Sequence, residues 1–290
     1  MIRAAKYLCF FVICGVALAT AAATQLSPRP GETDLRTGPL PPLQPFNLTA
    51  VYEVSWGGVD VGDLVLHARE DNNQYNMRIQ IKSSGLARLL TRHESATTVK
   101  GKKKGERYLP ERFETNFKLR GDTRHIILTY NEQGELVEEY NQPPEKRWKR
   151  PEVPMSLKRD VPDIMTMLFI ERHKIYDALK QEDDNFTIRT FDGRRLTDVH
   201  FNVSGRKTVT WNDQQADVIA FGVKREAIAG YKDSELEDMR KKKDPNVEFY
   251  LKDDGTLTPL KIVVEAEAGT FYANLSDYCE KLEACLKHLK

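Results

Sequence analysis

The chain has 290 residues, with 44 Lys and Arg against 43 Asp and Glu, which gives a formal net charge of +1. This balance provides no general attraction for polyanions and disfavours nucleic-acid binding. The length exceeds that of a typical domain, although single β-sandwiches and β-barrels often reach it.

The first residues have the layout of a secretory signal. Arg3 and Lys6 precede an apolar run over residues 7–18, and small residues follow to Ala23. The run is shorter than the ~20 residues that a membrane-spanning helix needs, so a signal peptide over residues 1–23 is favoured over a signal anchor. Its removal leaves 42 basic and 43 acidic residues and no second long apolar segment. We expect a protein that does not span a membrane, exported to an oxidising compartment such as a bacterial periplasm.

A proline-rich segment separates this signal from the rest of the chain. Residues 24–46 hold six prolines and few large apolar residues, which predicts an extended, solvated linker. Apolar and polar residues then alternate from Val51 to Trp56, and Gly57-Gly58 predicts a tight hairpin. In the returning strand, residues 59–68, the apolar phase shifts across Gly62-Asp63, as a β-bulge would produce. Strong curvature is expected there.

Strand patterns continue along the chain and are interrupted by one helical segment. Turn-forming residues separate the further strands, which are expected at 75–83, 94–100, 112–119, 124–130, 186–190, 197–203, 207–211, 216–224, 247–252, 260–266 and 270–275. About a dozen short strands predict a mainly β fold, either a strongly curved antiparallel sheet or an open β-barrel or β-roll. A single domain over residues 47–276 is expected, followed by a tail over 277–290.

The helical segment over residues 161–179 is the most informative element. From Ile164 to Ile170 only Thr166 is polar, so the helix is expected to be central and enclosed by the sheet. It either lines a site for an apolar ligand or simply fills the core. Residues 85–90 predict a short helix at the rim of the sheet, which likewise either lines a ligand site or fills the core. The candidate ligand contacts are Trp56, Leu86, Leu89, Met165, Met167, Leu168 and Phe169.

No catalytic motif, cofactor fingerprint or metal-binding spacing is found. The six histidines are scattered, and the chain lacks a nucleophile elbow and a phosphate loop. Catalytic residues, metal ligands and cofactors are therefore not expected.

Basic clusters are expected in three loops. They comprise Lys102, Lys103 and Lys104, then Arg147, Lys149 and Arg150, and finally residues 240–243. If these loops met on one rim, they would suit anionic headgroups or an envelope polymer. The alternative is that each cluster serves only solubility.

Cys279 and Cys285 are the cysteines that remain after residue 23. An oxidising compartment favours a disulfide between them, with a turn near residues 281–283. A continuous amphipathic helix would instead hold them about 9 Å apart along its axis, beyond disulfide reach.

Several segments together resemble the bacterial domain-of-unknown-function family 3108. They include residues 52–59, Gly85-Leu86 with residues 92–95, residues 108–111, the helix start at 161–164 and the segment 254–260. The resemblance implies export by Gram-negative bacteria and a fold, but no activity. Our leading hypothesis is a periplasmic carrier that binds an apolar or amphipathic envelope component, a lipid or a lipoprotein-like ligand. The alternative is a scaffold or assembly factor that contacts an anionic polymer or a partner protein.

Overall fold

The computed structural model describes residues 33–34, 38–146, 150–181, 184–211, 214–241, 245–267 and 269–289. The predicted signal peptide and most of the predicted linker lie outside the described residues, as do Arg147 and Lys149 and the side chain of Leu86.

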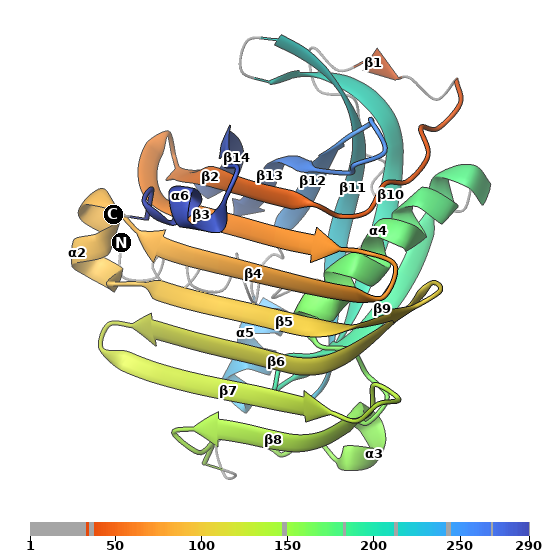
Figure 1. Ribbon diagram of the computed structural model, residues 1–290. Coiled ribbons are helices and arrows are strands. Elements are labelled where there is room, and N and C mark those ends of the chain that lie inside the picture. The colour runs from red at the N-terminus through yellow and green to blue at the C-terminus, as the bar shows by residue number, and fades with distance from the viewer. Residues whose placement is uncertain are drawn as a thin grey trace.

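Within these ranges the strands form one mainly antiparallel sheet of fourteen strands (Figure 1). Seven consecutive strands form a meander: β2 (Leu48–Trp56), β3 (Val59–Glu70), β4 (Gln74–Ser83), β5 (Glu94–Lys104), β6 (Arg107–Leu119), β7 (Asp122–Tyr130) and β8 (Leu136–Gln142). The others are β1 (Thr33–Asp34), β9 (Asn185–Phe191), β10 (Leu196–Trp211), β11 (Gln214–Ala229), β12 (Asn246–Lys252), β13 (Pro259–Ala266) and β14 (Gly269–Tyr278).

The last strand joins the two halves of the sheet. β14 pairs with β2, so the order runs β1-β10-β11-β12-β13-β14 and then from β2 to β8, while β9 also pairs with β10. No hydrogen-bonded pairing between described residues joins β8 to β9 or β1, and the curved sheet is open. The predicted fold class is therefore confirmed.

The first hairpin follows its sequence pattern. Gly57 and Gly58 have φ angles of 57° and 82°, which residues with a Cβ atom rarely adopt. In the pairing of β2 with β3, Val54 lies opposite Gly62 and Ser55 opposite Asp60. Val61 is thus the extra residue of a bulge, next to the predicted position, and such a bulge increases the local twist.

Helix α4 (Ile164–Gln181) lies on the concave side of the sheet, between β5 and β6 on one side and β9 and β10 on the other (Figure 1). The carboxylate of Asp163 accepts hydrogen bonds from the backbone N–H groups of Met165 and Thr166, both at 2.9 Å. This cap starts the helix three residues after the predicted position at residue 161. The expected enclosure is confirmed, since Met165, Met167 and Phe169 are all buried.

Four elements were not expected from the sequence, namely β1, β8, α3 and α5. Leu136 is the only buried residue of the edge strand β8, so this strand has no alternation of buried and exposed residues. Helix α5 (Asp233–Lys241) has no buried residue, and its sequence is mostly charged. Two further short helices are α2 (Gly85–Thr91), at the predicted position, and α3 (Met155–Lys158). No helix of the described ranges is long and apolar enough to cross a membrane.

The last residues of the predicted linker belong to the core, which corrects the linker boundary at residue 46. Phe46 is 4% exposed and packs against Phe169, with ring centroids 5.9 Å apart. The backbone N–H of Gln44 donates a hydrogen bond to the carbonyl of Gly255 at 2.9 Å. The aromatic side chain of Phe46 gives this segment a buried anchor that its proline content does not reveal.

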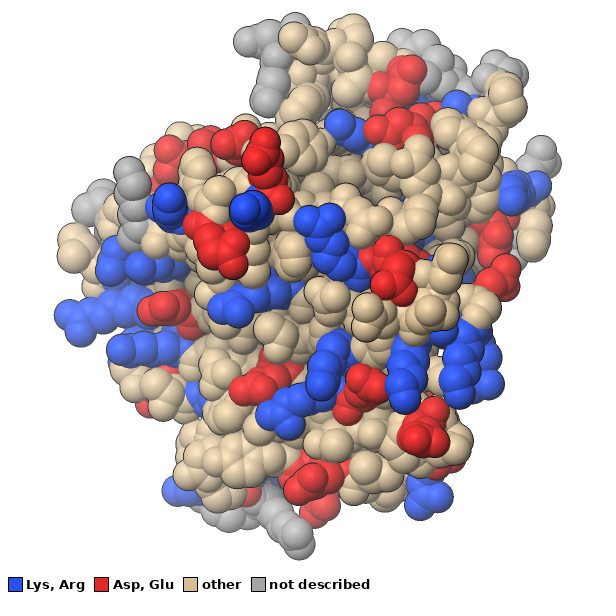
Figure 2. Space-filling model, in the orientation of Figure 1, with Lys and Arg blue, Asp and Glu red and all other residues tan. Residues whose placement is uncertain are grey.

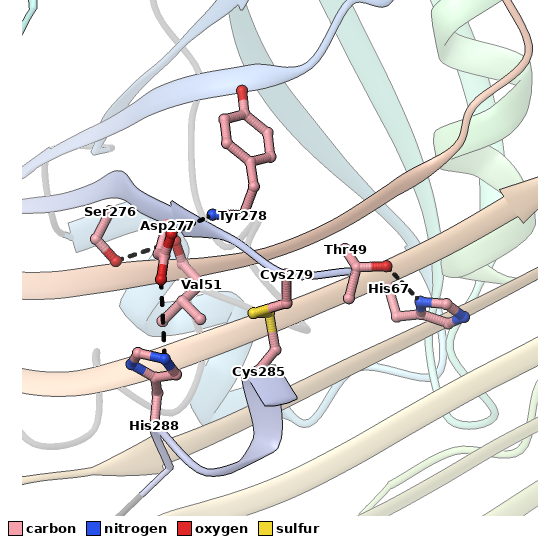
Figure 3. Close-up of a disulfide and its surroundings, with 9 residues drawn as sticks. All are labelled: Thr49, Val51, His67, Ser276, Asp277, Tyr278, Cys279, Cys285 and His288. Atoms are coloured by element: carbon pink, nitrogen blue, oxygen red, sulfur yellow. Dashed lines mark hydrogen bonds and ion pairs between the residues drawn. A yellow bond between two sulfur atoms is a disulfide. The ribbon is translucent and has the colours of Figure 1, made fainter. Parts of the chain in front are cut away.

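The C-terminal tail packs on the outer face of β2 and β3, with Cys279 bonded to Cys285 (Figure 3). The chain turns immediately after β14, and α6 (Leu282–Leu286) begins after the turn, so the continuous-helix alternative is not what the structure shows. Cys285 is fully buried against Val51 and Val65, which form a small apolar cluster with the tail. Because the disulfide joins residues only six apart, it contributes about 2 kcal/mol to stability. That is enough to hold the tail in place but not to stabilise the whole fold.

Candidate ligand-binding cavity

A cavity of about 170 Å³ lies between α4 and the concave face of the sheet. Its walls come from α4, from β2 to β4, from β10 to β14 and from the segments that flank them. Apart from two charged residues the walls are apolar or aromatic: Phe46, Tyr52, Val54, Leu64, Leu66, Met77, Ile79, Ile164, Met165, Met167, Leu168, Val199, Phe201, Val223, Val247, Phe249, Leu251, Leu257, Pro259, Ile262, Val264, Phe271, Tyr272 and Ala273. An engineered apolar cavity of about 150 Å³ stays dry and binds benzene.

The strand walls follow directly from side-chain alternation. On β12 the lining residues are Val247, Phe249 and Leu251, and those on β13 include Ile262 and Val264. Successive side chains of a strand point to opposite faces, so every second residue reaches the concave side. The apolar period of two in the sequence therefore produces one continuous apolar surface.

The helix wall is a single arc of α4. Successive residues of an α-helix are about 100° apart, so the lining residues of α4 fall within about 160° of its circumference. They are Ile164, Met165, Met167, Leu168, Glu171 and Arg172.

Three of the four ligand contacts predicted on α4 line this cavity, namely Met165, Met167 and Leu168. Phe169 does not, because it lies about 40° beyond Met165 around the helix. Its ring instead packs against Tyr75 and Tyr108, with centroid distances of 4.8 and 5.4 Å.

The other predicted contacts lie elsewhere. Leu89 is 76% exposed, because α2 presents that side chain to solvent and not to the cavity. Trp56 is not a lining residue, since it lies at the hairpin end of β2, where it stacks on the lining residue Phe271 with ring centroids 5.7 Å apart. The prediction of Leu89 and Trp56 as direct contacts is therefore corrected.

Glu171 and Arg172 are the charged residues of the lining. Glu171 is 7% exposed and has no hydrogen-bond or ion-pair partner among the described residues. Burial raises the pKa of its carboxyl to about 8, so the group is mainly protonated at neutral pH. Burial lowers the pKa of Arg172 to about 10, and the guanidinium remains charged. One end of the apolar cavity thus offers a neutral acid and a cation.

Arg172 also belongs to a buried polar network centred on Glu70 of β3. The guanidinium lies 3.4 Å from the Glu70 carboxylate and donates a 2.6 Å hydrogen bond to the carbonyl of Thr256. Its Nε atom is buried without a hydrogen-bond partner among the described residues. The guanidinium also lies over the ring of Phe46, 4.2 Å from its centroid. Arg172 is therefore fixed in place while one of its donors stays unused.

The Glu70 carboxylate is held in the ionised form. Burial alone would raise its pKa, but the surrounding cations and hydrogen-bond donors hold the pKa well below its usual range. The neighbours that lower this pKa are His173, Lys103, Tyr108 and the backbone N–H of Phe46, with the last three at 2.5, 2.5 and 2.8 Å.

Comparison with known proteins identifies the family of this chain. Residues 51–276 match the family described as protein of unknown function (DUF3108). This chain belongs to the DUF3108 family. Every lining residue of the cavity except Phe46 falls within the matched range.

A solved structure with a similar chain path is described as a β-barrel-like protein of domain of unknown function DUF1849 from Brucella abortus. It is 9% identical, with a TM-score of 0.49 over 82% of this chain and all of that chain. No curated protein matches this DUF3108 chain.

Among the described basic residues predicted to meet an anionic partner, some are paired inside this DUF3108 protein. Lys102, Lys103 and Lys104 lie in β5 and not in a loop, because β5 continues four residues beyond its predicted end. Lys103 is paired with Glu70, and Lys102 lies 3.5 Å from Glu111.

Arg150 is also unavailable to an external partner. Its side chain is 2% exposed, pairs with Glu235 at 2.6 Å and donates a hydrogen bond to the carbonyl of Gly230. The face drawn in Figure 2 shows acidic and basic residues interspersed. Burial and pairing thus remove Lys103 and Arg150 from the predicted set.

The described residues contain no group of three or more His, Cys, Asp or Glu side chains arranged to hold a metal ion.

Sequence reasoning missed Glu171, Arg172 and Glu70. A signal for the first two was present, because they lie seven residues after Ile164 and Met165 and so fall on the same helix face. Glu70 carried no such signal, since its contact with Arg172 spans 102 residues of chain.

Proposed function

We propose that this DUF3108 protein is exported to the periplasm and binds an apolar or amphipathic component of the cell envelope in the cavity beside α4. The observation that carries the proposal is the cavity itself, with apolar walls and a single polar end. Protein pockets for small ligands share this composition, in which apolar walls provide affinity and a few polar groups fix the orientation. Met165 and Met167 add adaptable side chains to the wall.

Export is supported by the tripartite N-terminal pattern and by the disulfide between Cys279 and Cys285. Disulfides persist in oxidising compartments and are rare in the cytosol. The scaffold alternative has less support, because Lys103 and Arg150 pair with acidic residues inside the protein.

Filling the cavity tests the proposal. Leu168→Trp places a larger side chain in the lining, so we expect the affinity for 1-octanol, measured by titration calorimetry, to fall by about tenfold or more. Leu89→Trp adds the same side chain at an exposed position and should leave binding unchanged. Circular dichroism checks that both variants are folded. Failure of the wild type to bind either 1-octanol or octanoate would refute the proposal, as would equal binding by the two variants.

A further inference from the structure

The polar end of the cavity indicates which ligand chemistry it accepts. Glu171 is buried, lines the cavity beside the positive charge of Arg172 and has no hydrogen-bond or ion-pair partner among the described residues, while the buried Nε of Arg172 also lacks a hydrogen bond there. Buried polar groups are normally paired, because an unpaired group loses its hydration without compensation. Two such groups on consecutive residues of one wall mark a place where a ligand supplies the missing hydrogen bonds.

We propose that the ligand is a single-chain amphiphile whose carboxylate binds at Glu171 and Arg172 while its hydrocarbon chain occupies the apolar cavity. The inference rests on the proposed function and specifies its substrate class.

The donors at this end favour an acceptor. Arg172 Nε carries a hydrogen to donate, and the neutral carboxyl of Glu171 supplies an O–H donor. A carboxylate can accept both hydrogen bonds. An alcohol can also accept them but brings no charge, and an alkylammonium has only donors to present.

The charges at this end also favour one negative charge on the ligand. Lys103 and Arg172 are cations, and both contact the single carboxylate of Glu70. Glu171 adds no charge while it is protonated. One positive charge of this group is therefore not balanced, and a carboxylate would compensate for it in a buried setting where such compensation matters.

The size of the cavity favours one short chain. About 170 Å³ is close to the volume of an apolar cavity that holds benzene. Octanoate is therefore a suitable probe, with 1-octanol and octyl phosphate as ligands that have the same chain and another headgroup.

The environment of Glu171 determines how pH acts on binding. The titratable side chains that line the cavity with it are Arg172 on the same helix, Tyr52 on β2 and Tyr272 on β14. Glu70 on β3 adjoins it through Arg172. The hydroxyl of Tyr52 donates to the carbonyl of Pro259, and burial raises its pKa far above the range tested. Glu171 is therefore the group whose charge changes between pH 7 and pH 9.

Calorimetric titration of the full-length protein tests the inference. At pH 7 wild type should bind octanoate about tenfold or more tightly than 1-octanol, as expected for hydrogen bonds to a charged group. Raising the pH to 9 should weaken octanoate binding by about tenfold, because ionised Glu171 repels the carboxylate and no longer donates. The affinity for 1-octanol should change much less.

Two substitutions at one position separate the donor from the charge. Glu171→Gln keeps a donor and cannot ionise, so it should retain octanoate binding and lose the pH dependence. Glu171→Leu removes the donor and should weaken octanoate binding by about tenfold while 1-octanol still binds. Asp177→Asn, at an exposed position of the same helix, is the matched control and should behave as wild type.

The outcomes are distinguishable. Equal binding of octanoate and 1-octanol by wild type would overturn the carboxylate inference and leave the proposed cavity function standing. The same holds for unchanged octanoate binding by Glu171→Leu or for a preference for octyl phosphate. Failure of all three probes to bind would overturn both proposals.

Discussion

Met165→Lys is expected to lower the free energy of unfolding by roughly 3 to 5 kcal/mol, the cost of an uncompensated buried charge. Met165 is 2% exposed and lies on the apolar arc of α4. The new ammonium must either remain charged in an apolar cavity or lose its proton, and both cost free energy. Urea unfolding followed by circular dichroism measures the effect.

The matched control is Met155→Lys on α3, where the native side chain is 37% exposed. That variant should stay within about 0.5 kcal/mol of wild type, as surface substitutions usually do. If both variants unfold at the same urea concentration as wild type, the enclosure of α4 by the sheet is contradicted.

Glu70→Gln is expected to destabilise the protein by about 3 to 5 kcal/mol at pH 7, because it leaves the buried charge of Arg172 without its carboxylate. The Glu70 side chain is 2% exposed. Glu111→Gln removes a carboxylate from a partly exposed pair with Lys102 and should cost at most about 1 kcal/mol. Urea unfolding of both variants gives the comparison.

The effect of Glu70→Gln should depend on pH in a defined direction. The pKa of Glu70 is lower in the folded protein than its ordinary value of 4.5, so its ionised form favours folding. That contribution is fully present above the unfolded pKa and is lost as the pH falls toward the folded pKa. The difference between wild type and Glu70→Gln should therefore narrow below about pH 4.5. A difference that is constant from pH 7 to pH 3 would contradict the role assigned to the charge.

Much of the sheet could be predicted because its information is local. The Gly57-Gly58 hairpin and the bulge near Gly62 follow from turn chemistry and from a change of apolar phase. Edge strand β8 escaped detection because only Leu136 among its residues is buried. Helix α5 escaped because it buries none of its residues, and polar helices leave no apolar period to detect.

The cavity could be predicted only in part. The segment from Ile164 to Ile170 is apolar on nearly every side, so its sequence indicates burial but cannot choose the arc that faces the cavity. The sequence therefore predicts Met165 and Phe169 equally as ligand contacts, although only Met165 lines the cavity. The Glu70 network depends on contacts between β3, β6 and α4, and pairings over such sequence separations carry no periodic signal.

Native mass spectrometry of the protein expressed with its signal and recovered from the periplasm tests the central claim most directly. We expect a fraction of the wild-type protein to carry an additional mass that is lost on denaturation. Extraction should identify that mass as a single-chain amphiphile with a carboxylate. Leu168→Trp should carry little of it, and Leu89→Trp should carry as much as wild type. Bare wild-type protein that also fails to take up added octanoate or 1-octanol would contradict a ligand-binding cavity.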